Sequence, residues 1–104
     1  MKEETIRRIR KFTADRDWDK YHSPNALAKT IAIEATELLE CFQWNEDADI
    51  NKVKEELADV IVNCQNLIDK LNLDVDKVVN EKMDQNEKKY PVKKFKGIAK
   101  KYNE

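Results

Sequence analysis

The sequence has very little of what sheet proteins need, with one glycine and two prolines among its 104 residues. Sheets require many tight turns, which these residue types supply, so the shortage favours long helices. No apolar run approaches the roughly 20 residues that a membrane-spanning helix needs. The first residues are charged and do not resemble the apolar core of a secretory signal. We therefore expect an all-α cytoplasmic protein that does not bind membranes.

Histidine and cysteine are also scarce, with one and two copies respectively. A zinc or di-iron site would therefore lack ligands. Cys41 and Cys64 both fall inside helical patterns, and we expect them to be reduced packing residues. Twenty basic residues against 21 acidic ones leave a net charge of −1. Such a balance provides no overall field to attract nucleic acid, so nucleic acid is not an expected partner.

Apolar periodicity predicts four helices, at about residues 3–15, 24–42, 50–71 and 75–89. Ser23 followed by Pro24 is a strong start for the second helix. That helix is apolar around most of its circumference, which indicates burial among neighbours. The simplest arrangement is one bundle over residues 1–91, followed by a basic tail over 92–104. A chain this short with such an apolar helix is expected to form an obligate homo-oligomer.

Two pairs of carboxylates adjoin the apolar stripes of neighbouring helices. Glu34 and Glu37 are three residues apart on the second helix, and Glu56 and Asp59 are three apart on the third. If these helices run antiparallel, the pairs can lie opposite each other. Four converging carboxylates need compensating cations, and an all-oxygen set suits Mg²⁺ or Mn²⁺. The alternative is chance spacing among 21 acidic residues; periodicity alone indicates a metal site and no substrate.

The residues around these pairs form a longer pattern. The stretch EATELLECFQW begins at Glu34, and EELADV begins at Glu55. Together they resemble the MazG-like all-α nucleotide pyrophosphohydrolases, and more narrowly their small dCTP pyrophosphatase-like branch. Ile33 replaces the first glutamate of the family pattern, as is typical of that branch. The resemblance covers about residues 12–102 and includes RDW at 16–18, KMDQN at 82–86, YPV at 90–92 and KGIAKKY at 96–102.

The resemblance implies a four-helix MazG-like fold in a tight homodimer or homotetramer, with sites where subunits meet. It implies Mg²⁺-dependent hydrolysis of a (deoxy)nucleoside triphosphate to the monophosphate and pyrophosphate, a nucleotide-pool house-cleaning reaction. Mn²⁺ is a possible substitute for Mg²⁺. The implied catalytic metal ligands are Glu34, Glu37, Glu56 and Asp59. Glu40 lies one turn further along the same face, where it can orient a ligand.

Trp18 and Trp44 are candidate stacking surfaces for the base, with core or interface packing as the alternative. His22 either hydrogen-bonds the substrate or supports the helix start. Lys82, Asn86 and Tyr90 share one helix face, and the resemblance implies that they contact the triphosphate. Two other functions stay open: a related pyrophosphohydrolase acting on another diphosphate-linked substrate such as phosphoribosyl-ATP, and a non-catalytic helical interaction module.

Overall fold

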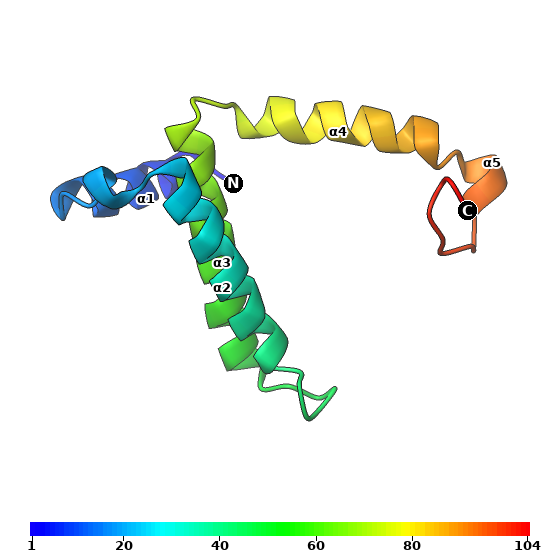
Figure 1. Cartoon of the computed structure of the whole chain (residues 1–104), viewed down its shortest axis with the longest axis horizontal. Coiled ribbons are helices and arrows are strands. Elements are labelled where there is room, and N and C mark those ends of the chain that lie inside the picture. Colours follow the sequence, from blue (N-terminus) through cyan, green and yellow to red (C-terminus); the bar gives the residue numbers. More distant parts are fainter. The chain divides into compact units, whose positions relative to one another are not determined.

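Helices make up all the regular secondary structure of the chain, whose computed structural model describes residues 1–104 (Figure 1). They fall into two compact units, Met1–Asn72 and Leu73–Glu104, which we describe separately. The first unit contains α1 (Glu3–Asp15), the short 3-10 helix η1 (Asp19–Tyr21), α2 (Pro24–Glu40) and α3 (Ile50–Lys70). The second contains α4 (Val75–Lys89) and the single turn α5 (Val92–Phe95). The predicted all-helical class is confirmed.

Side-chain caps start the three longest helices where the sequence predicted. The Ser23 hydroxyl accepts a hydrogen bond from the backbone N–H of Ala26 at 3.1 Å, with Pro24 in the first turn of α2. Asp49 caps α3, and Asp74 caps α4. Each cap satisfies backbone N–H groups that have no partner within the helix.

The end of α2 differs from the prediction by two residues, because the helix stops at Glu40 rather than at Phe42. The backbone tightens there: Cys41 donates to the carbonyl of Leu38, and Phe42 donates to that of Leu39. Such bonds between residues three apart are common where an α-helix unwinds. The connection at residues 19–21 and part of the tail, expected to be irregular, form η1 and α5.

The centre of the first unit is an antiparallel pair formed by α2 and α3, which lie side by side (Figure 1). Leu27 is the one buried apolar side chain of the chain, at 2% exposure. Ile33 and Leu39 of α2 are 58% and 68% exposed. The prediction that α2 is buried among neighbours is therefore not met within a single chain, because these side chains remain uncovered in it.

A polar network joins α1 to α3. The Arg10 guanidinium donates to both carboxylate oxygens of Asp69, with Nη2–Oδ1 at 2.7 Å and Nε–Oδ2 at 3.0 Å. Gln65, which is 2% exposed, donates from its amide nitrogen to Oδ1 of Asp69 at 3.1 Å. The hydrogen bond from Arg10 lowers the pKa of the Asp69 carboxyl, partial burial opposes that shift, and Gln65 adds to it. The network fixes α1 against the C-terminal half of α3.

Replacing Asp69 with asparagine should lower the melting temperature by a few degrees at neutral pH, because a forked charge-assisted contact is lost. Since folding lowers the pKa of Asp69 below its ordinary 3.8, its contribution is complete above that value and disappears as the pH falls through the folded-state pKa. Thermal unfolding from pH 2 to 7 checks both points. The melting temperatures of the wild type and the variant should converge near pH 2. A constant difference between them at every pH would contradict this account.

The second unit ends in a small aromatic cluster. The ring of Tyr90 meets those of Phe95 and Tyr102 edge to face, with centroids 5.0 Å and 5.9 Å apart. Gly97 has a φ of +78°, a conformation that glycine adopts without strain. The predicted basic tail, residues 92–104, thus folds back onto the end of α4. None of the helices has the combination of length and apolar composition that crossing a membrane requires.

Candidate metal and nucleotide site

Carboxylates from α2 and α3 meet across the antiparallel pair. One oxygen from each of Glu34, Glu56 and Asp59 lies within 4.8 Å of the others. Glu34 comes from α2, whereas Glu56 and Asp59 are one turn apart on α3. Three of the four predicted carboxylates therefore converge in the first unit.

Glu37 belongs to the same acidic group. Burial raises the pKa of the Glu34 carboxyl, and a hydrogen bond with Glu37 and the charge of Glu37 raise it further. The pKa of Glu56 is raised for the same reasons in the same order, with Asp59 adding repulsion. Such shifts arise where several carboxyl groups share a site without enough compensating positive charge.

Two oxygens of this acidic group lack partners. The Oε2 atoms of Glu34 and Glu56 are shielded from solvent and accept no hydrogen bond from the protein. A buried carboxylate oxygen without a donor is costly, and a bound cation would remove that cost. Hard divalent cations prefer carboxylate oxygens. The residues present therefore fit Mg²⁺ or Mn²⁺.

Two neighbouring glutamates stand apart from the acidic group. Glu40, predicted to orient a ligand, is the last residue of α2 and is exposed. Glu55, next to Glu56 in sequence, is also exposed. Neither contributes an oxygen to the convergent set.

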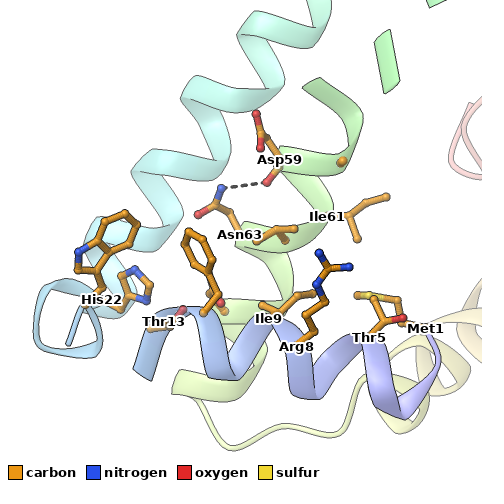
Figure 2. Close-up of a pocket in the computed structure, with 14 residues that line it drawn as sticks. Met1, Thr5, Arg8, Ile9, Thr13, His22, Asp59, Ile61 and Asn63 are labelled. Carbon is orange, nitrogen blue, oxygen red and sulfur yellow. Dashed lines mark hydrogen bonds between the residues drawn. The ribbon is translucent and has the colours of Figure 1, made fainter. Parts of the chain in front are cut away.

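A pocket of about 710 Å³ lies beside the acidic group, between α1 and α3 (Figure 2). Asp59 lines it, so the acidic group and the pocket share a residue. Trp18 and His22, two of the predicted substrate residues, also line it, and the Trp18 ring meets Phe12 edge to face at 5.6 Å. The rest of its wall is largely apolar and includes Ile9, Phe12, Ile61 and Val62.

The sequence did not identify five polar residues of this pocket. Thr5, Arg8 and Thr13 reach it from α1, and Asn63 and Asn66 reach it from α3. The available signal was the spacing of Asp59, Asn63 and Asn66, which puts three polar side chains on one face of a core helix. The packing of α1 against α3 could not be predicted, because α1 and α3 are far apart in the sequence.

The other predicted substrate residues lie elsewhere. Trp44 is in the loop between α2 and α3, is 89% exposed and does not line the pocket. Lys82 and Asn86 are on α4 in the second unit, and Tyr90 is the residue that ends that helix. Their spacing of four puts them on one face, with Asn86 half-buried.

Comparisons with known proteins place the chain in a family. The model of the MazG-like family matches residues 29–104. The dCTP pyrophosphatase 1 of Rattus norvegicus is 36% identical to this chain, and that of Homo sapiens is 33% identical. Each alignment covers 97% of this chain and 66% of the relative, so this chain spans about two thirds of their length.

A solved structure, a pyrophosphatase from Archaeoglobus fulgidus, superimposes with a TM-score of 0.79 at 40% sequence identity. The match covers 86% of this chain and 91% of that one. The matched family region contains all four acidic residues of the site. By sequence and by fold, the chain belongs to the MazG-like family.

Proposed function

We propose that this protein is a Mg²⁺-dependent nucleoside triphosphate pyrophosphohydrolase, which converts a (deoxy)nucleoside triphosphate to the monophosphate and pyrophosphate. The observation that carries the proposal is Asp59, which belongs both to the acidic group and to the wall of the adjoining pocket. A nucleoside in the pocket would place its phosphates beside the carboxylates. The relatives named dCTP pyrophosphatase support dCTP-like nucleotides as substrates. Action on modified nucleotides and a house-cleaning role in the cytoplasm are parts of the same proposal.

Glu34, Glu37, Glu56 and Asp59 are the proposed ligands of Mg²⁺, with Mn²⁺ as a substitute. The chemistry supplied by the bound ion is neutralisation of the triphosphate and a lowered pKa for the attacking water. The two partnerless oxygens of Glu34 and Glu56 would hold the ion in place. A carboxylate of this group would also accept the proton that the water loses as it attacks the α-phosphorus.

The remaining residues bind and orient the substrate in this proposal. Trp18 would stack on the base, and His22, which is half-buried, would hydrogen-bond the nucleoside. Trp44 would contact the base, and Glu40 would orient a ligand. The family resemblance supports Lys82, Asn86 and Tyr90 as contacts of the triphosphate. The apolar wall formed by Ile9, Phe12 and their neighbours excludes water from the base.

Phosphorus NMR of the products, with Mg²⁺ and with a chelator, tests the reaction. We expect monophosphate and pyrophosphate only when Mg²⁺ is present. In ¹⁸O-labelled water the label should enter the monophosphate, because attack is at the α-phosphorus. Release of orthophosphate would contradict the proposal, and so would an absence of turnover across a broad panel of triphosphates. Turnover of phosphoribosyl-ATP instead would favour the alternative substrate.

We also propose that the protein is a homodimer or homotetramer. The support is the near absence of a core within one chain: Leu27 alone is a buried apolar residue, while Ile33, Leu39 and Leu57 of the central pair are 44–68% exposed. Small domains need more burial than this to be stable. A second copy, which carries the same apolar surface, is the proposed cover.

Replacing Leu39 with glutamate should dissociate the assembly, because it places a charge in the proposed interface. Analytical ultracentrifugation at micromolar concentration should show the wild type at two or four times 12.3 kDa and the variant shifted toward smaller species. Asn25→Glu adds the same charge at an exposed polar position of α2 and should leave the mass unchanged. A monomeric wild type would contradict the proposal.

A further inference from the structure

The η1 connection, residues 16–23, joins α1 to α2 and carries two residues of the pocket wall. Trp18 immediately precedes η1, and His22 immediately follows it. Both line the pocket, and Figure 2 shows His22 at the end of the pocket next to this connection. The position of η1 relative to α3 therefore decides where these two side chains can meet a substrate.

Backbone hydrogen bonds set the shape of the η1 connection and join it to α1. Tyr21 donates to the carbonyl of Trp18 at 2.9 Å, and His22 donates to that of Asp19 at 3.0 Å. The backbone N–H of Trp18 donates to the carbonyl of Thr13 in α1 at 3.1 Å. None of these bonds reaches α3, which forms the opposite wall of the pocket.

Lys70, the last residue of α3, supplies a contact between α3 and η1. Its ammonium donates to Oδ1 of Asp19 at 3.1 Å and to the backbone carbonyl of Asp19 at 3.3 Å. That carbonyl also accepts the N–H of His22, so Lys70 binds both the side chain and the backbone of the first residue of η1. An ion pair in which the aspartate is 76% exposed contributes little to stability, and its main effect is expected in the placement of η1.

We propose that Lys70 is a positioning residue for the substrate: by binding Asp19 it fixes η1 against α3 and so holds Trp18 and His22 at the pocket. The inference rests on the proposed function and deepens it. Lys70 does not line the pocket, so it acts through η1 and not by touching the substrate. The competing role is to offset the partial negative charge at the C-terminus of α3, which would affect stability and leave substrate binding unchanged.

Replacing Lys70 with alanine should raise KM for dCTP by roughly three- to tenfold with little change in kcat, because the side chains that hold the substrate remain but are less well placed. Lys70→Arg keeps a cation that can donate to both acceptors and should recover most of the affinity. Lys11→Ala is the matched control, since it removes a lysine from another exposed ion pair, with Asp15 of α1, and should leave KM unchanged.

Two readouts separate positioning from a merely structural role. Adding Lys70→Ala to a Trp18→Ala/His22→Ala variant should raise KM no further, because the side chains through which Lys70 acts are already missing. In a Trp44→Phe background Trp18 is the only tryptophan. There Lys70→Ala should increase quenching of its fluorescence by acrylamide, a measurement that needs no substrate.

The outcomes distinguish failure of this inference from failure of the proposed function. If the wild type hydrolyses no triphosphate, the proposed function fails, and the role of Lys70 in substrate binding fails with it. If the wild type is active and Lys70→Ala lowers the melting temperature but leaves KM unchanged, the role of Lys70 is overturned while the function stands. Additive increases in KM in the combined variant would also overturn it. Asp19→Ala removes the same contact from its exposed side and provides a second variant if Lys70→Ala fails to fold.

Discussion

Replacing Glu56 with glutamine is expected to reduce kcat/KM by more than about 100-fold, a larger loss than removal of an outer partner of a metal site produces. The change keeps the size of the side chain and removes the charge that the proposed cation needs. The Oε2 atom of Glu56 is buried without a partner, so this oxygen has no evident role other than binding a cation. Turnover at saturating Mg²⁺ measures the loss, and isothermal titration with Mg²⁺ should show weaker binding.

Glu55→Gln is the matched control, since it makes the same change at the preceding, exposed residue. Its kcat/KM should stay close to that of the wild type. Equal losses in the two variants would show that overall charge matters rather than the carboxylate at position 56, and the assignment of Glu56 as a ligand would then be wrong.

Glu56→Gln should also stabilise the protein when no metal is present. Folding raises the pKa of Glu56 above its ordinary 4.5, mainly through burial and then through Glu37. A raised carboxyl pKa means that the folded state binds more protons, so the metal-free wild type loses stability as the pH rises from 4.5 through the folded-state pKa. The glutamine variant lacks this loss. In chelator, the melting temperature should therefore fall less from pH 4 to pH 7 for the variant than for the wild type.

Replacing Trp18 with alanine is expected to raise KM by roughly 10- to 100-fold with little change in kcat, because stacking on an aromatic ring contributes about 1–3 kcal/mol per base. Trp18 lines the pocket and is held edge to face by Phe12, yet it remains 45% exposed. That combination provides a fixed ring with an open face. Steady-state kinetics should show a similar increase in KM with a pyrimidine and with a purine substrate, since stacking does not depend on the hydrogen-bonding groups at the edge of a base.

Trp18→Phe separates stacking from packing, because phenylalanine retains an aromatic face and should recover most of the affinity. If alanine and phenylalanine raise KM equally, the indole has a role that stacking does not explain. A fall in kcat without a change in KM would instead indicate that Trp18 supports α1 and the pocket wall, and does not hold the base.

The sequence predicted the local features of this protein well and the distant ones poorly. The caps at Ser23, Asp49 and Asp74 are short-range signals, so the helix starts could be read directly. The acidic residues of α2 and α3 could also be paired, because the helices are consecutive and an antiparallel pair is their simplest arrangement. The same reasoning could not find the pocket, since α1 meets α3 only after the chain has passed through α2.

Two features of the fold could not be predicted from local patterns. The apolar pattern of α2 predicted burial among neighbours, and Ile33 and Leu39 are exposed within one chain; a periodic pattern shows that a face needs cover and not which molecule provides it. The burial of Gln65 could not be predicted from the sequence either. A glutamine within an apolar stripe suggests an exposed position, yet it is buried because Asp69 and Arg10 supply polar partners.

The acidic group has a consequence for how the protein folds. All four carboxylates come from two helices joined by one loop, so the contacts that assemble the site have short sequence separation. Short-range contacts close at low entropic cost and form early. The site can therefore form while the rest of the chain is still emerging from the ribosome. If the proposed cation binds the nascent hairpin, it would offset the carboxylate repulsion, and the yield of folded protein would then depend on the cation supply.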